Sequence, residues 1–263
     1  MLIVFSGGSG VGKNTVIERL LESDEFSLMP TYTTRDRRPN EREGYPYHFI
    51  SEEVFLEKLR SGELYEHQLV HEHYYGTSKV LMAESLATGK ILLKDIDVIG
   101  TQNLVNSVGK SVKMITLFLK VNSRLVLEQR LKERGEKEIE LRLKRYDMEQ
   151  AYADNYDYII NNEMLDKTLG IVKTIIENER MGRLPLAAVK SPVIDKNLVE
   201  EYVQKLNSFK KLQPMPVSVV GGRIVVVDQY EKYLAQMISG QKVAKEVVDF
   251  TGGATFEFDW KNQ

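Results

Sequence analysis

Residues 1–15 read MLIVFSGGSGVGKNT, and this stretch predicts the fold of the segment that it opens. An apolar run from Leu2 to Phe5 leads into a glycine-rich turn and Lys13, and apolar residues then recur with helical spacing at Val16, Ile17, Leu20 and Leu21. A strand, a loop whose backbone N–H groups face phosphate, and a helix follow one another in this order in phosphate-binding proteins. We therefore expect a phosphate loop at the start of an α/β domain.

The loop has the spacing GxxxxGK, in which the lysine neutralises phosphate charge. We expect it to bind phosphate, which the family resemblance described below implies to be that of ATP, through residues that follow one another in the chain, namely Gly7, Gly8, Ser9, Gly10, Val11, Gly12, Lys13, Asn14 and Thr15. Asn14 stands where a serine or threonine usually places a hydroxyl near Mg²⁺. We expect Mg²⁺ to be bound through ATP, near Asn14, and predict no side chain as its direct ligand.

The composition is that of an ordinary globular protein. Its 263 residues are 42% hydrophobic and 28% charged, with a formal net charge of -2 and no cysteine. The absence of cysteine excludes disulfides and thiol chemistry, and the balanced charge predicts no nucleic-acid or membrane partner. Since no apolar run approaches the ~18 residues of a spanning helix, we expect a cytoplasmic protein.

Short apolar runs alternate with helical patterns as far as Arg183. The predicted strands are Leu2–Ser6, Ile91–Leu93, Met114–Leu119 and Tyr158–Ile160. The predicted helices are Thr15–Glu22, Glu52–Arg60, Lys79–Ala87, Arg124–Arg134, Glu138–Tyr152 and Leu165–Arg180. Apolar strands separated by helices predict a mainly parallel sheet that is covered on both faces.

Residues 33–49 read TTRDRRPNEREGYPYHF, a polar and basic segment. Together with GSGVGK upstream, it resembles the guanylate kinase family, and the resemblance extends from Leu2 to about Arg180. It implies the three-layer α/β sandwich of P-loop NTPases with an inserted GMP-binding region at about 31–78. It also implies that GMP is bound here by Thr31, Thr34, Arg35, Arg38, Glu41 and Tyr47. Forked guanidinium donors suit the 5′-phosphate.

Residues 62–78, GELYEHQLVHEHYYGTS, resemble the second acceptor segment of that family. The resemblance implies that Glu66 reads guanine, that Tyr75 binds phosphate and that the hydroxyl of Thr77 faces guanine O6. This agrees with guanine chemistry, since one carboxylate can accept both N1–H and N2–H while a hydroxyl donates to O6. Adenine offers neither pattern, so GMP is the expected acceptor.

The remaining site residues follow the central strand and lie in a helical lid at about 124–150. Asp95 and Asp97 match an acidic pair that the guanylate kinase family has near the acceptor and the metal. Lys94 departs from the apolar residue that is usual at its position in that family. In the lid, the resemblance implies that Arg130 and Arg142 close on the transferring phosphates. It places Arg134 and Asn162 near adenine. The expected catalytic residues are Lys13, Arg35, Asp97, Arg130 and Arg142.

A second pattern begins after Arg183. We predict a separate small α+β domain over 184–263, with helices at Asn197–Leu206 and Tyr230–Ile238, strands at Pro216–Val219 and Arg223–Val227, and an apolar segment at Val243–Phe250. The order helix, LQP, strand, glycine turn, strand and helix resembles the ParB-like fold. The GxRR or GHHR signature of that family is replaced by Asp228–Tyr233, so we do not transfer DNA binding or nucleotide hydrolysis. A binding, regulatory or homodimerising role is favoured over altered phosphotransfer through Asp228, Glu231 and Lys232.

The motifs together predict a nucleoside monophosphate kinase that transfers the γ-phosphate of Mg·ATP to GMP. Two alternatives remain open at this point. A ribose-bisphosphate kinase of the same superfamily would not require Glu66 and Thr77 to read guanine. A non-catalytic guanylate-kinase-like scaffold would not require the glycines and Lys13 of the phosphate loop, although Asn14 keeps this second alternative open.

Overall fold

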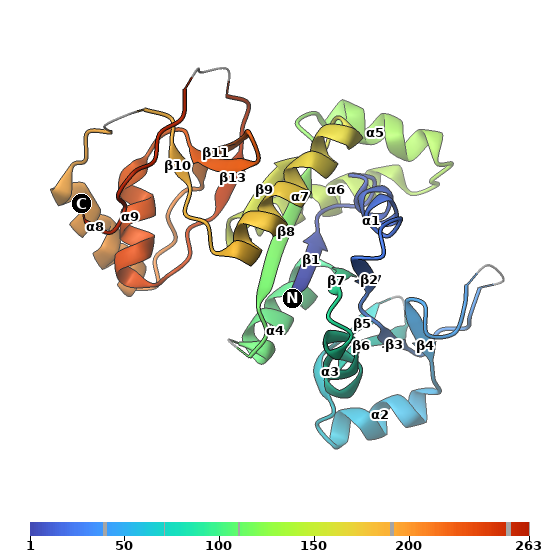
Figure 1. Ribbon diagram of the computed structural model, residues 1–263. Helices are drawn as coiled ribbons and strands as arrows, with labels where there is room; N and C mark the ends of the chain where they lie inside the picture. The colour runs from blue at the N-terminus through green and yellow to red at the C-terminus, as the bar shows by residue number, and fades with distance from the viewer. Residues whose placement is uncertain (39–40, 71, 110, 190–191, 251–253, 263) are drawn as a thin grey trace. The chain divides into compact units, whose positions relative to one another are not determined.

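The structure is a computed structural model that describes residues 1–38, 41–70, 72–109, 111–189, 192–250 and 254–262 (Figure 1). Pro39 and Asn40 of the acceptor motif therefore lie outside the described residues. The chain forms two compact units. The first contains residues 1–6 and 13–116, and the second contains residues 7–12 and 117–263.

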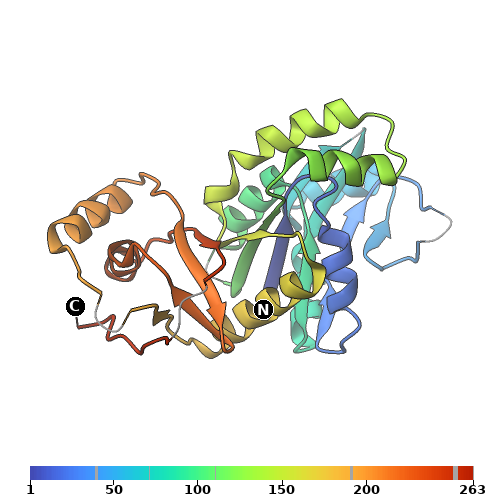
Figure 2. The same ribbon diagram turned by 90° about the horizontal axis from the view of Figure 1, so that it is seen from above.

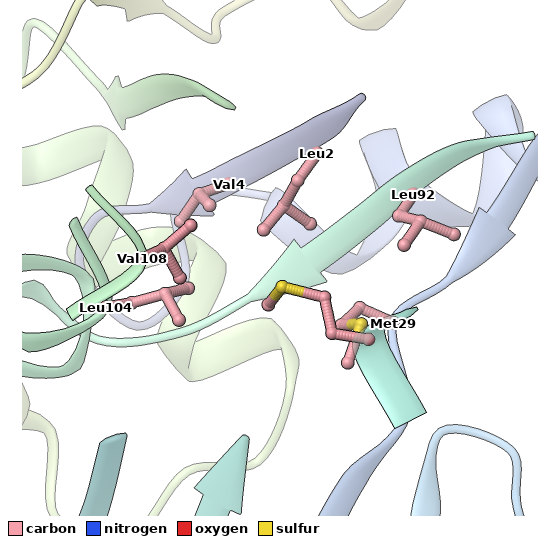
Figure 3. Packing of buried hydrophobic residues seen from close by; sticks show 7 residues of the cluster. Leu2, Val4, Met29, Leu92, Leu104 and Val108 are labelled. Atoms are coloured by element: carbon pink, nitrogen blue, oxygen red, sulfur yellow. The ribbon is translucent and has the colours of Figure 1, made fainter. Parts of the chain in front are cut away.

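Three parallel strands form the centre of the first unit, in the order β1 (Leu2–Ser6), β7 (Ile91–Asp95) and β2 (Phe26–Leu28). All five residues of β1 are buried, as their continuous apolar run predicts for a strand covered on both faces. Figure 3 shows part of the core on one face, where Leu2, Val4, Met29 and Leu92 pack with Leu104 and Val108. The core fixes the carboxyl end of β7, where Asp95 and Asp97 lie.

Three helices pack against these strands. They are α1 (Lys13–Leu20), α3 (Lys79–Ala87) and α4 (Val98–Val108). Helix α4 begins at Asp97, whose carboxylate caps it by accepting a hydrogen bond from the Gly100 N–H. We did not predict α4, because Gly100 and the β-branched residues of VIGTQNLVNSV have weak helix propensity. Packing of its buried Leu104 and Val108 against the sheet stabilises it instead.

The polar segment after Met29 forms a sheet of its own. This four-stranded sheet has the order β4 (Tyr47–Phe49), β3 (Thr31–Thr33), β6 (His73–Ser78) and β5 (Leu64–Val70), and α2 (Glu52–Arg60) connects β4 to β5. Only β3 and β4 are parallel. Their short, polar sequences did not predict strands, because the pairing partners are distant in the sequence. The sheet supplies the walls of the pocket described below.

The second unit contains residues 7–12 of the glycine loop and a sheet of six strands. Its strand order is β8 (Met114–Lys120, from Leu117 onward in this unit), β9 (Tyr158–Asn161), β13 (Lys245–Val247), β11 (Met215–Val220), β12 (Arg223–Val226) and β10 (Leu186–Ala187). Every neighbouring pair is parallel except β11 and β12, which meet across the turn Gly221-Gly222. The expectation of an α/β fold with a mainly parallel sheet is confirmed.

The helices of this unit are α5 (Arg124–Glu133), α6 (Ile139–Gln150), η1 (Ala153–Asn155), α7 (Leu165–Met181), α8 (Lys196–Asn207) and α9 (Tyr230–Ser239). Helix α8, drawn in orange in Figure 2, lies beside α9, which is drawn in a darker red-orange. Within the described part of the chain, no helix is long and apolar enough to cross a lipid bilayer.

Residues after Arg183 share a sheet with those before it, because β13 pairs with β9. Several side-chain contacts cross the same junction. Among them, the Lys120 ammonium lies 2.6 Å from a Glu246 carboxylate oxygen, and Asn178 donates to the Gly222 carbonyl at 2.9 Å. The division into 1–183 and 184–263 stays a prediction. The structure adds that residues 117–183 and 184–263 belong to the same compact unit.

Candidate active site

The glycine loop, residues 7–12, follows β1 and has a backbone that larger residues rarely adopt. Gly7, Gly10 and Gly12 have φ values of 128°, 89° and 95°. A Cβ on Gly7 would lie 2.1 Å from the Leu119 carbonyl oxygen, and a Cβ on Gly12 would lie 2.5 Å from the Asn162 amide nitrogen. The glycines are therefore needed both for the turn and for the close approach of its neighbours.

Asn162 holds the end of this loop. Its buried side-chain amide donates a 2.8 Å hydrogen bond to the Val11 carbonyl oxygen. The guanidinium of Arg130, from α5, donates to the same carbonyl at 3.4 Å and to the Asn162 carbonyl at 3.1 Å. Two residues that we expected at the nucleotide, from distant parts of the sequence, thus meet at the loop.

Arg142, from α6, reaches the loop as well. It donates a 2.9 Å hydrogen bond to the Ser9 hydroxyl, and its other terminal nitrogen lies 2.9 Å from a Glu136 carboxylate oxygen. Arg134 differs from these two arginines, because it forms the C-cap of α5 and is exposed. The structure therefore brings Arg130 and Arg142 to the loop, whereas it leaves Arg134 on the surface.

Lys13 begins α1 in the first unit, at the position where a helix N-terminus favours anions. Its ammonium lies 3.9 Å from an Asp95 carboxylate oxygen, and its side chain is only 15% exposed. The next two residues, Asn14 and Thr15, are exposed. Their amide and hydroxyl oxygens are of the hard type that Mg²⁺ prefers.

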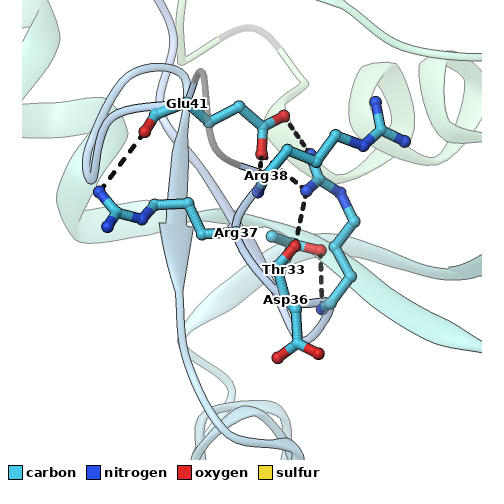
Figure 4. Close-up of polar contacts among 6 residues, drawn as sticks. Thr33, Asp36, Arg37, Arg38 and Glu41 are labelled. Carbon is cyan, nitrogen blue, oxygen red and sulfur yellow. Dashed lines mark hydrogen bonds and ion pairs between the residues drawn. The ribbon is translucent and has the colours of Figure 1, made fainter.

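Arg35 is held by Glu41 in a bidentate ion pair, with nitrogen–oxygen distances of 2.7 and 2.5 Å. One Glu41 oxygen also accepts a hydrogen bond from the Arg38 backbone N–H at 2.9 Å (Figure 4). The pair lowers the pKa of Glu41 to about 2, chiefly through the Arg35 hydrogen bonds. The Arg35 guanidinium also lies 5.0 Å from the centre of the Tyr47 ring. Glu41 thus positions arginine, whereas the Arg38 side chain is exposed.

Thr34 forms a link between strands in the same region. Its hydroxyl oxygen accepts a hydrogen bond from the Tyr74 N–H at 2.9 Å, and its own N–H donates to the Tyr74 carbonyl at 3.1 Å. Both interactions join the ends of β3 and β6. The structure therefore gives Thr34 a fixed structural contact beside the arginines.

A cavity of about 200 Å³ lies beside these groups in the first unit. Six of the residues that we expected at GMP line it, namely Thr31, Tyr47, Glu66, Tyr75, Asp95 and Asp97. The rings of Tyr47 and Tyr75 meet edge to face, with their centres 5.9 Å apart. Burial raises the pKa of the Tyr47 phenol, which keeps it a hydrogen-bond donor at neutral pH. The cavity thus combines aromatic walls with carboxylates.

Glu66 is the buried carboxylate of the cavity. It accepts a short hydrogen bond from the Thr77 hydroxyl, which is itself fully buried. Burial raises the pKa of Glu66, and the positive charge of Lys94 opposes this rise. Thr77 therefore contacts Glu66, which lines the cavity.

Asp97 has a structural role in addition to lining the cavity. One of its carboxylate oxygens accepts hydrogen bonds from the Gly100 N–H at 2.8 Å and from the Gln68 side-chain amide at 2.9 Å. The first bond caps α4, and the second connects α4 to β5. Asp97 is therefore a strand-end residue that caps the following helix, and its two hydrogen bonds fix one end of the cavity.

Four further residues line the cavity, namely Gln68, Val70, Lys94 and Ile96. None of these four is among the residues that we expected at the site. The alternation of β5 could have identified Gln68 and Val70, because residues at i+2 and i+4 from Glu66 face the same side of a strand. For Lys94, the signal is an ammonium directly after an apolar run, at a position where the family pattern has an apolar residue.

Within the described residues, no group of three or more histidines and carboxylates could hold a metal ion. Mg²⁺ commonly keeps several waters and is bound through one or two carboxylates and substrate phosphates, so a protein cage is not required. Asp95, Asn14 and Thr15 offer oxygen donors of the suitable type next to Lys13 or on its helix. These residues fit an ion that arrives with a nucleotide.

Comparison with known proteins agrees with this geometry. The family model described as guanylate kinase matches residues 1–179. Among similar proteins are the guanylate kinases of Nitrosospira multiformis, 35% identical over 68% of this chain and 86% of the relative, and of Desulfotalea psychrophila, 36% identical over 68% and 89%. The guanylate kinase of Helicobacter pylori is 37% identical over 66% of this chain and 87% of the relative.

A solved structure is also similar. The crystal structure of guanylate kinase from Anaplasma phagocytophilum superposes with a TM-score of 0.54 at 27% identity, over 69% of this chain and 86% of that chain. The family match covers the glycine loop, both acceptor segments and the arginines of α5 and α6, and it ends shortly before the second sequence pattern begins. On the extent of this match, the chain belongs to the guanylate kinase family.

Proposed function

We propose that this protein transfers the γ-phosphate of ATP to GMP and so produces ADP and GDP. The observation that carries the proposal is the buried carboxylate of Glu66 in a cavity of about 200 Å³. One carboxylate can accept N1–H and N2–H of guanine, a donor pair that adenine lacks. Family membership and the shared motifs support the same reaction.

We assign the acceptor phosphate to Arg35, Arg38, Tyr47 and Tyr75. Arg35 is already oriented by Glu41, so little conformational entropy is lost when it binds an anion. The 5′-phosphate of GMP has a second pKa of about 6 and is mostly dianionic at neutral pH, so it needs no general base. The reaction then depends on positioning and on charge neutralisation.

We assign the phosphates of ATP to the glycine loop, Lys13, Arg130 and Arg142. The backbone N–H groups of the loop and the N-terminus of α1 favour phosphate, and the three cations offset the charge that is shared during transfer. We propose Mg²⁺ as the ion that accompanies ATP, with Asn14, Thr15 or Asp95 as the residues near it. The bound ion would neutralise phosphate charge. Arg134 and Asn162 are proposed to lie near adenine.

Coupled measurement of ADP release, with GMP, dGMP, AMP, UMP and ribose bisphosphate as acceptors, tests the proposal. We expect turnover with GMP and dGMP, and at least about 100-fold lower kcat/KM with AMP, because a buried carboxylate without its donors is costly. Activity only with ribose bisphosphate would favour a sugar-phosphate kinase. Binding of GMP without ATP binding or turnover would favour a non-catalytic scaffold.

For residues 184–263 we propose a binding or dimerising role. The order α8, β11, the glycine turn, β12 and α9 supports a resemblance to the ParB-like fold, which stays a prediction. Sedimentation of the full chain with and without ATP and GMP tests whether this segment mediates a homodimer. A monomer under all conditions would contradict dimerisation.

A further inference from the structure

Lys94 is a buried cation in the core strand of the first unit. It follows the apolar residues Ile91, Leu92 and Leu93 on β7, and it is only 3% exposed. An ammonium in such a place is costly unless polar groups compensate it. Its nitrogen donates a 2.8 Å hydrogen bond to the Thr31 hydroxyl oxygen, and both residues line the cavity. The contact therefore joins two elements at the proposed base pocket.

The hydroxyls of Thr31 and Thr77 have opposite hydrogen-bond roles: Thr31 accepts a hydrogen bond, whereas Thr77 donates one. An ammonium has three donors and no acceptor, so the Thr31 hydroxyl must accept from Lys94 and keeps its own hydrogen for another partner. A carboxylate only accepts, so Thr77 donates its single hydrogen to Glu66. While that bond lasts, Thr77 cannot also donate to a base. Thr31 is the hydroxyl with a hydrogen to offer.

We propose that Lys94 is a positioning residue that commits Thr31 to donate a hydrogen bond to the 6-oxo group of the purine. This inference rests on the proposed function and deepens it. It adds to Thr77, where the family resemblance had placed recognition of the 6-oxo group, a pair that includes a residue at which this chain departs from the family pattern. A 6-amino group would present hydrogens to the Thr31 donor, so the same pair disfavours adenine.

The charges around Lys94 support this arrangement. Burial lowers its pKa, while Glu66 on β5 and Asp95 on β7 raise it. In turn, Lys94 favours the ionised form of Glu66, the form that accepts both guanine donors. Lys13 on α1 and Asp97 act on Asp95, while Asp97 and His67 on β5 act on Glu66. One ammonium thus orients Thr31 toward the 6-oxo group and favours the ionised form of Glu66 that accepts N1–H.

The test is the variant Lys94→Met, which keeps the length and apolar volume of the side chain. We expect KM for GMP and for IMP, which shares the 6-oxo group, to rise about 10-fold. The kcat values and the kcat/KM for AMP should stay within about twofold, so that the GMP:AMP selectivity falls about 10-fold. The acid limb of kcat/KM for GMP should move to higher pH, because Glu66 loses a neighbouring positive charge.

A double-mutant cycle separates this role from simple structural support. Thr31→Val should cause the same selectivity loss, and Lys94→Met combined with Thr31→Val should cost no more than either change alone. Lys94→Met combined with Thr77→Val should be close to additive. Lys245→Met is the matched control, because Lys245 is also a buried lysine and lies on β13 in the other unit. Lys245→Met should leave the GMP:AMP selectivity unchanged, and it should not shift the pH at which kcat/KM for GMP falls in acid.

An unchanged GMP:AMP selectivity in Lys94→Met would overturn the inference, as would equal weakening for GMP and AMP or additivity with Thr31→Val. Calorimetric titration of GMP, IMP and AMP gives the same comparison without turnover. If Lys94→Met does not fold, Thr31→Val alone decides, because retained selectivity in that variant contradicts the inference. Wild-type protein that neither binds nor phosphorylates GMP would refute the proposed function itself, before any variant is compared.

Discussion

The guanidinium of Arg35 and the carboxylate of Glu41 form a bidentate pair, with nitrogen–oxygen distances of 2.7 and 2.5 Å. Such a pair fixes the plane of the guanidinium, whose remaining donors can face a phosphate. Since Glu41 also accepts from the Arg38 N–H, one carboxylate holds both Arg35 and the Arg38 backbone (Figure 4). The arginine proposed for the acceptor is therefore positioned before any ligand arrives.

Glu41→Gln should weaken GMP binding even though Glu41 itself carries the same sign of charge as the phosphate. We expect KM for GMP to rise about 10-fold with little change in kcat, because Arg35 must be ordered on binding. Glu43→Gln is the matched control on the same loop, since Glu43 pairs with the neighbouring His48. A lower KM for GMP in Glu41→Gln would show that the carboxylate mainly repels the phosphate.

The Arg35–Glu41 pair also predicts how stability responds to acid. The folded-state pKa of Glu41 is about 2, below the ordinary value of about 4.3 for glutamate. Its contribution should therefore be complete above about pH 5 and be lost as the pH falls toward about 2. Urea titrations at several pH values compare wild type with Glu41→Gln. The difference in unfolding free energy should shrink in acid, and a constant difference would contradict the linkage.

Gly12→Ala should impair ATP use through one identifiable collision. The new Cβ would lie 2.5 Å from the Asn162 amide nitrogen and would displace the bond that holds Val11. We expect kcat/KM for ATP to fall at least about 10-fold, because the loop geometry sets the phosphate contacts. Gly62→Ala is the matched control, because Gly62 also has positive φ but meets nothing within 4 Å. Equal effects of both changes on ATP would contradict this explanation.

Arg142→Met should act mainly on turnover. Arg142 contacts Ser9 of the loop and Glu136, and a cation there is proposed to stabilise charge on the transferring phosphate. We expect kcat to fall about 100-fold or more, with a smaller effect on KM for ATP. Arg124→Met, which removes an exposed pair with Asp147, should retain nearly full kcat. Single-turnover kinetics measure the chemical step in both variants.

Glu66 predicts a pH dependence of acceptor use. Burial raises its pKa above the ordinary value of about 4.3, and the protonated form cannot accept both guanine donors. The kcat/KM for GMP should therefore fall as the pH drops through this raised value. Glu66→Gln should lower kcat/KM for GMP at least about 100-fold and leave only the decrease in acid that is set by the second pKa of the GMP phosphate, about 6. Glu63→Gln, at an exposed carboxylate, is the control that should keep the decrease set by Glu66.

Removal of residues 184–263 should destabilise the remaining chain. It exposes the edge of β9 that pairs with β13, and it breaks the contacts of Lys120 with Glu246 and of Asn178 with Gly222. We expect the midpoint of thermal unfolding to fall by at least about 5 °C. Lys205→Met, at an exposed pair on α8, should leave it unchanged. An undiminished midpoint in the truncated protein would show that residues 1–183 fold independently of the C-terminal segment.

The sequence alone determined the features that depend on local pattern. Four strands and six helices could be predicted before residue 183, since apolar spacing and capping residues act over a few positions. The bounds of α2 and α3 were predicted to the residue, whereas α4 and the short strands of the second sheet were not. The GxxxxGK loop and the acceptor motifs likewise have fixed local spacing, which is why they indicated the family.

Only the tertiary structure decided which distant groups meet. The partners Lys94 and Thr31 are 63 positions apart, and Asn162 reaches Val11 across 151 positions, so no local spacing could reveal either contact. The pairing of β13 with β9 is equally long-range. Local sequence can set secondary structure and supply chemical groups, but long-range packing selects their partners. Such packing places Lys94, at which this chain departs from the family pattern, beside Thr31 at the cavity, and its proposed role depends on that contact.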